Sequence, residues 1–113
     1  MKPIQKTLLT LAVSALLAVP ALAGSDLVLT YGANNSAKLT SNLAQPIYLT
    51  GFQHSNGYIN LALQLAAGQT LPLQLSGSRP TSLWGRALSA NGKPLAGHTP
   101  DADGGYELSV LIQ

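Results

Sequence analysis

The chain has 113 residues, of which 46% are hydrophobic and only 9% are charged, and it contains no cysteine. The missing cysteines exclude disulfides, thiol redox chemistry and cysteine-based zinc sites. Residues 1–23 hold two of the six basic residues, so the remaining chain has four basic and four acidic side chains and a net charge of zero. A neutral chain without a basic cluster is not expected to bind nucleic acid or anionic membranes.

The first 23 residues have the features of a secretory signal peptide. Lys2 and Lys6 precede an apolar run, which is followed by the small-residue end Ala21-Leu22-Ala23. The run is shorter than the roughly 20 apolar residues that a membrane-spanning helix needs. We therefore predict a cleaved signal helix at 1–23 and one exported domain at 24–113, with no stable membrane anchor. An exported domain without disulfides is typical of the bacterial periplasm or cell surface.

The first half of the exported domain alternates apolar and polar residues over short segments. We predict strands at 25–31, 38–41 and 45–52, because a period of two places alternate side chains on one face of a sheet. The segment from Gly32 to Ser36 is predicted to be a turn. Asn56-Gly57 predicts a type I′ hairpin turn into the next strand, since both central residues of that turn need positive φ.

Residues 58–76 form the most regular stretch of the chain. Leucine or isoleucine occupies every second position from Ile59 to Leu65, and leucine does so again from Leu71 to Leu75. Leucines at every second position would lie on opposite sides of a helix, so the period favours strands. We predict two facing strands joined at 67–69, with Leu63 in the middle of a core-facing row.

The last part of the chain continues the same alternation. A strand is predicted at 82–90, with Leu83 on one face and Trp84 on the other, followed by a tight hairpin at Asn91-Gly92 that returns through 93–97. A polar, turn-rich segment then leads to a final strand at 106–113. We predict an all-β fold, a single antiparallel immunoglobulin-like β-sandwich of about seven strands, with a small closed barrel as the alternative.

The chain has few residues suited to catalysis or metal binding. Asp101 and Asp103 stand beside glycines, as in a calcium loop, but the further ligands of that loop are missing, which favours a plain turn. His54 and His98 lie in predicted loops and have no His or carboxylate partner at metal-site spacing. The nucleophile pattern G-x-S-x-G is absent. We predict a protein that is not an enzyme and has no catalytic residue, metal site or cofactor.

One group of residues suggests a binding surface. Trp84 with Arg79 and Arg86 would form an aromatic and cationic surface for a sugar or a partner chain, because an indole face stacks on sugars and on guanidinium groups. The alternative is that Trp84 covers the core and that the two arginines are simply solvated.

Two segments resemble known exported β-proteins. The closing GGYELSVLIQ resembles the C-terminal strand of chaperone–usher fimbrial subunits, in which a Gly-Tyr start leads into alternating apolar residues. The segment from Gly85 to Leu108, with ANGKPLAG and then DADGGYEL, resembles the carboxypeptidase-regulatory or transthyretin-like sandwich. In size the chain is similar to the immunoglobulin-like accessory factors of curli assembly. These resemblances imply an exported sandwich that binds proteins and assign no functional residue.

The leading hypothesis is a non-enzymatic interaction module that acts through strand edges as a component or accessory factor of fimbria or fibre assembly. The terminal runs Leu27 to Tyr31 and Tyr106 to Gln113 are almost uncharged, so one of them would accept a strand from a fibre subunit, unless both pair inside the sheet. The alternatives are a carbohydrate- or protein-binding sandwich and an inhibitor of an exported enzyme.

Overall fold

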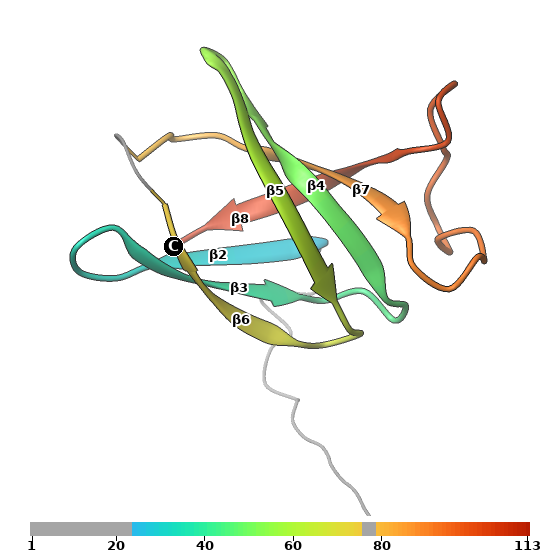
Figure 1. Ribbon diagram of the computed structural model, residues 1–113, viewed down its shortest axis with the longest axis horizontal. Helices are drawn as coiled ribbons and strands as arrows, with labels where there is room; N and C mark the ends of the chain where they lie inside the picture. The colour runs from blue at the N-terminus through green and yellow to red at the C-terminus, as the bar shows by residue number, and fades with distance from the viewer. Residues whose placement is uncertain (1–23, 76–78) are drawn as a thin grey trace, which may run out of the picture.

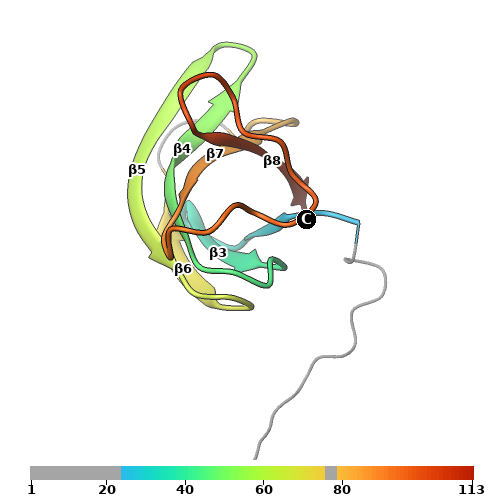
Figure 2. The ribbon, with the colours of Figure 1, turned by 90° about the vertical axis from the view of Figure 1, so that its right-hand side faces the viewer.

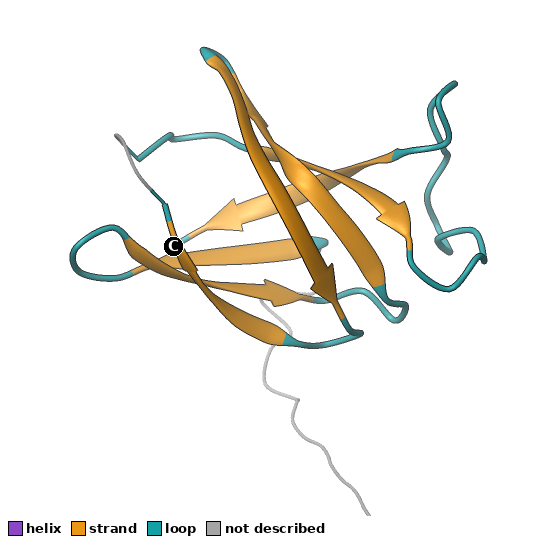
Figure 3. Ribbon diagram, in the orientation of Figure 1, coloured by secondary structure: helices purple, strands orange, loops and turns teal. Residues whose placement is uncertain are grey.

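The computed structural model describes residues 24–75 and 79–113, and this part of the chain consists of strands and loops without a helix (Figure 3). No helix in the described ranges is therefore long and apolar enough to cross a membrane. The predicted signal peptide lies outside the described residues. The strands are β2 (Leu27–Tyr31), β3 (Ser36–Ser41), β4 (Ile47–His54), β5 (Gly57–Leu65), β6 (Thr70–Gln74), β7 (Trp84–Ser89) and β8 (Tyr106–Ile112).

All seven strands belong to one sheet with the order β5-β4-β7-β8-β2-β3-β6. The sheet curls into an incomplete barrel, which is seen end-on in Figure 2. β8 joins the two halves of this barrel. Its residues 106–109 pair antiparallel with β7, and its residues 110–112 pair parallel with β2. The two ends of the sheet, β5 and β6, are not paired with each other.

The prediction of an all-β fold with about seven strands is confirmed. The prediction of a wholly antiparallel sandwich is wrong at one pair, because β2 and β8 run parallel. Parallel strands need a long connection, and these two are separated by all the other strands. The sheet is not a closed barrel either, since β5 and β6 are not hydrogen-bonded neighbours and diverge from the connection that joins them (Figure 1).

The turns at 32–36 and at 55–56 differ in which residues have a positive φ. At the predicted 32–36 turn, Asn34 and Asn35 have φ values of 56° and 63°, as a type I′ turn requires. The predicted type I′ turn at Asn56-Gly57 is wrong, because β4 and β5 pair through His54 and Gly57, so that residues 55–56 form the turn. Among these residues only Gly57 has a positive φ, 151°.

The predicted second hairpin is wrong, although the chain does bend at Asn91-Gly92. β7 ends at Ser89 and β8 begins at Tyr106, so residues 93–97 are part of a long loop and not a strand. The Asn91 side chain accepts a hydrogen bond from the Lys93 amide at 3.0 Å, which forms the bend. Turn chemistry predicted this bend, but it does not determine whether the returning residues find a strand to pair with.

The side chains of Gln45, just before β4, and of Tyr106 on β8 hold this loop in place. The Gln45 amide group donates to the Pro94 carbonyl at 2.9 Å and accepts from the Ala96 amide at 2.9 Å. The Leu95 amide donates to the Tyr106 hydroxyl at 3.2 Å, and Leu95 is buried in the core. The loop therefore closes one end of the barrel with a leucine.

The core fills the inside of the curled sheet. Most inward-facing side chains of the interior strands are buried and alternate with outward-facing ones, as a period of two predicts. Val110 and Ile112, at the end of β8, are only partly buried. The largest fully buried apolar side chains are Phe52, Leu27, Leu29, Leu39, Ile47, Leu49, Leu65 and Leu108. Leu63 faces the core as predicted, but it is only partly buried.

This difference in burial gives a stability prediction for Leu49 on β4 and Leu63 on β5, which are paired directly across the two strands. Replacing the fully buried Leu49 by Ala should cost about 2 to 5 kcal/mol, because it leaves a cavity. Leu63→Ala should cost about 1 to 2 kcal/mol, since part of its surface is already exposed. Gln64→Ala, at an exposed position, should stay within about 0.5 kcal/mol. Urea denaturation of the three variants measures these costs, and equal costs at 49 and 63 would contradict the edge position of β5.

Candidate functional site

The leucine-rich stretch forms the two open edges of the sheet. Its two strands were predicted to face each other, but β5 pairs only with β4, and β6 pairs only with β3. The connection between them is a turn in which the Gln69 amide donates to the Ala66 carbonyl at 3.1 Å and the Gln69 side chain accepts from the Ala66 amide at 2.8 Å. Gly68, with a φ of 72°, allows this turn. The turn carries the chain from one edge of the sheet to the other.

The open edges leave apolar side chains partly uncovered. Leu63, Leu71 and Leu73 face the interior, and each is paired with a buried residue of the neighbouring strand. They are nevertheless only half-buried, because a side chain on an edge strand has a neighbouring strand on one side alone. Five half-buried side chains of this kind pack against the core from the two edges: Ile59, Leu61, Leu63, Leu71 and Leu73.

Proline protects the β6 edge. The Ser41 amide donates to the Gln69 carbonyl at 2.9 Å, and the Leu75 amide donates to the Asn35 carbonyl at 3.0 Å, so the odd-numbered residues from 69 to 75 bond to β3. The main-chain groups of Thr70, Pro72 and Gln74 therefore face the open side. Pro72 has no N–H to offer there, which interrupts the row of donors. A groove of about 580 Å³ that Pro72 helps to line lies beside this edge.

The β5 edge has no such protection. Its nine residues include no proline and no charged residue, and the whole segment from Leu39 to Leu75 contains no Lys, Arg, Asp or Glu. The register of the sheet shifts between Leu49 and Gly51. Relative to β7 the extra residue is Thr50 of β4, whose hydroxyl donates to the Arg86 carbonyl at 2.9 Å. Relative to β4 the extra residue is in β5, where Leu61 and Ala62 together lie opposite Thr50. The outer edge of β5 is therefore unpaired and has neither a charge nor a proline.

The terminal strands are not the free edges that the leading hypothesis expected. β2 lies between β8 and β3, and β8 lies between β7 and β2, with its first half paired to β7 and its second half to β2. The alternative, in which the termini pair with each other inside the sheet, is therefore the correct one. The leucine-rich stretch was assigned to the core because it is the most apolar part of the chain.

The three residues predicted to form a binding surface do not lie together. Trp84 and Arg86 share the outward face of β7, but the Arg86 guanidinium forms an ion pair with Asp101. Arg79 is placed elsewhere: its guanidinium lies 4.6 Å from the ring centroid of Tyr31 and donates to the Gly32 carbonyl. Trp84 is 47% exposed and does not belong to the core cluster, so it does not cover the core.

An open depression of about 320 Å³ adjoins Trp84. Its lining residues come from β4, β8 and the segments beside β5 and β7, and they are Gln53, His54, Ser55, Ser82, Trp84 and Glu107. Strand register brings the central ones together, because Gln53 is opposite Trp84, and Glu107 is opposite Arg86 two residues further along β7. Sequence reasoning found only Trp84 among these residues. The others are polar residues without a motif, and only strand pairing places them around the indole.

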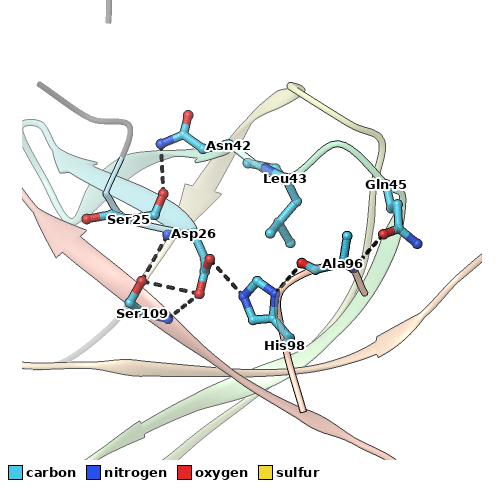
Figure 4. A network of polar contacts seen from close by, with 9 residues as sticks. Ser25, Asp26, Asn42, Leu43, Gln45, Ala96, His98 and Ser109 are labelled. Atoms are coloured by element: carbon cyan, nitrogen blue, oxygen red, sulfur yellow. Dashed lines mark hydrogen bonds and ion pairs between the residues drawn. The ribbon is translucent and has the colours of Figure 1, made fainter. Parts of the chain in front are cut away.

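A partly buried polar network joins the start of β2 to β8 and to the 90–105 loop (Figure 4). Asp26 accepts from the Ser109 amide at 2.9 Å and from its hydroxyl at 3.2 Å, and the Asp26 amide donates to the Ser109 hydroxyl at 2.9 Å. The other Asp26 carboxylate oxygen lies 2.9 Å from Nε2 of His98, and Nδ1 of His98 lies 2.9 Å from the Ala96 carbonyl. Both partners of the imidazole accept hydrogen bonds, so both ring nitrogens donate only when the ring is charged.

This network is structural and is not arranged as a catalytic triad. The Ser109 hydroxyl bonds to Asp26 and not to the imidazole, and both ring nitrogens of His98 already have partners, so no base contacts the serine. In the described ranges, 24–75 and 79–113, no three His, Asp or Glu side chains gather closely enough to hold a metal ion. Asp101 and Asp103 lie in a turn, where Asp103 accepts from the Gly105 amide at 2.9 Å.

Comparison with known proteins gives no match, since no family model, no curated protein and no solved structure is similar to this chain.

The His98 network predicts a stability that depends on pH. The hydrogen bond to the Ala96 carbonyl, and then the bond and charge of Asp26, raise the pKa of His98 against the opposing effect of burial. A raised pKa means that the folded chain binds this proton more tightly than the unfolded chain does. The stabilisation is therefore complete below about pH 6.5, the unfolded value, and is lost as the pH rises through the raised pKa.

The change that tests this is His98→Gln, with His54→Gln as its control. His98→Gln should lower the free energy of unfolding by about 1 to 2 kcal/mol more at about pH 5.5 than at about pH 8.5, since it removes charge-assisted hydrogen bonds. His54 lies at the β4–β5 turn, where its ring accepts only from the Asn56 amide, so its replacement should show no such difference. Urea denaturation at the two pH values measures this, and equal losses for His98→Gln would contradict a charged His98.

Proposed function

We propose that this chain is a non-enzymatic interaction module of the bacterial periplasm or cell surface, and that it accepts a partner's strand along the free edge of β5. The partner is a protein, a subunit of the fimbria or fibre in whose assembly the chain takes part as a component or accessory factor. The observation that carries the proposal is an unpaired, uncharged and proline-free edge strand whose inward leucines are half-buried.

Strand addition would satisfy two kinds of unmet interaction at this edge. The outer main-chain groups of β5 would gain a hydrogen-bonded partner, which gives affinity. Side chains of an added strand would cover the exposed part of Ile59, Leu61 and Leu63, and burying apolar surface contributes about 25 cal/mol per Å². Proteins that avoid such pairing usually place Lys, Pro or a bulge on the edge. β6 has its Pro72, whereas β5 has neither Lys nor Pro and only the irregularity at Leu61 and Ala62.

The resemblance of the closing segment to fimbrial subunits supports the choice of a fibre subunit as the partner. That segment forms β8, which lies in the interior of the sheet and is already paired with β7 and then with β2. In the proposed function β8 therefore holds the fold together, and β5 receives the partner. A chain that carried the same fold with a charged β5 edge would not have this function.

Lysine on the edge provides the test. The double variant Ala62→Lys with Gln64→Lys places two charges at exposed positions of β5, and Thr30→Lys places one at an exposed position of the interior strand β2. In the source organism deleted for this chain, wild type and Thr30→Lys should restore fibres counted by electron microscopy, and the β5 variant should reduce them at least about tenfold, which corresponds to 1.4 kcal/mol. All three chains should unfold at similar urea concentrations.

Site-specific photo-crosslinking shows which edge meets the partner. A photoreactive residue at Ala62 should crosslink to a fibre subunit, and the same residue at Thr30 should not. Full fibre assembly by the folded β5 variant, together with no crosslink from position 62, would contradict the proposal.

A further inference from the structure

The exposure of Trp84 differs from that of the other exposed apolar side chains, because each of those contacts a neighbour that accounts for its position. The described residues include four large apolar side chains that are highly exposed, all on the outward face of β4, β5 and β7: Tyr48, Tyr58, Trp84 and Leu88. Tyr48 and Leu88 are direct cross-strand neighbours and shield each other. The ring of Tyr58 lies over Gly51, where a side chain would collide with it. Trp84 has only Gln53 and Ser109 beside it in the neighbouring strands.

The polar groups around Trp84 are not used by the fold. Within the described residues, the side chains of Gln53, Ser82 and Glu107 form no hydrogen bond or ion pair with another protein group, and they line the same depression as the indole. The nearest cation along the sheet, Arg86, is paired with Asp101. An amide, hydroxyls and a carboxylate thus surround one open indole face, and all of them are available to a ligand.

We infer that this depression binds a neutral saccharide, with a pyranose ring stacked on Trp84 and its hydroxyl groups bonded to Gln53 and Glu107. The C–H face of a sugar packs on an indole, while its hydroxyls both donate to a carboxylate and accept from an amide. Glu107 forms no ion pair, although its charge acts on Arg86 across the two strands, and its carboxylate disfavours an anionic sugar. The volume of about 320 Å³ is at the small end of ligand sites, which suits one or two sugar rings. The site lies on β4, β7 and β8, separate from the β5 edge.

Trp84 also reports on its own site, because it is the only tryptophan in the chain. Titrating residues 24–113 with cellotriose, maltotriose or chitotriose should change the tryptophan fluorescence, with a Kd of about 1 mM for at least one of them. Ligand-observed NMR should show transfer of magnetisation to the ring protons of the same sugar. No response to any of the three sugars at tens of millimolar by either method would overturn the inference.

Three variants separate the site from its surroundings. Glu107→Gln keeps the shape of the side chain and should weaken sugar binding at least fivefold, and Trp84→Ala should abolish it in the NMR experiment. Tyr48→Ala removes an aromatic side chain of equal exposure, 47%, outside the depression, and it should leave binding unchanged. Equal losses for Tyr48→Ala and Trp84→Ala would overturn the inference, as would a fluorescence response to arginine methyl ester stronger than to any sugar. Self-association that requires Trp84 would show that a protein covers this face and would also overturn it.

Discussion

The fold depends on the side-by-side pairing of its first and last described strands. β8 changes partner in its middle, from β7 to β2, and Asp26 and Ser109 meet at the point of change. The Asp26 carboxylate accepts the Ser109 amide there, and His98 ties the same carboxylate to the loop that closes one end of the barrel. The Ser109 amide lies where β8 leaves β7 and joins β2, and the Asp26 side chain accepts its hydrogen bond there. Main-chain donors inside a protein generally need such a partner.

Placing both terminal strands in the interior determines which strands become edges. Once β2, β8, β7, β4 and β3 each have two neighbouring strands, β5 and β6 are left at the ends of the sheet. The turn at 66–69 connects these two ends without pairing them. The most apolar stretch of the chain therefore borders the opening of the barrel, and its leucines keep part of their surface exposed. The interaction we propose at β5 follows from this topology.

The two surfaces use different physical properties of the same sheet. The β5 edge offers main-chain hydrogen bonds and apolar side chains, which suit a strand. The face around Trp84 offers an indole and free polar groups from β4, β7 and β8, which suit a small polar ligand. Because Tyr48 and Leu88 shield each other and Tyr58 covers Gly51, the rest of this face needs no ligand to explain its composition.

The sequence by itself determined the strands and which side chains face inward, because a period of two is a local property that survives in any sheet. The rows from Leu27 to Tyr31 and from Tyr106 to Ile112 were predicted in this way. For Trp84 the pattern predicted only a face opposite to Leu83 and left open whether the indole covers the core. The tertiary structure alone decided which strands pair. No local pattern distinguishes an interior strand from an edge strand of equal hydrophobicity, so Leu63 was placed in the middle of a core-facing row although it is only partly buried. Pairing also decided that Gln53 and Glu107, and not Arg79 and Arg86, surround Trp84, since residues distant in sequence become neighbours only through strand register.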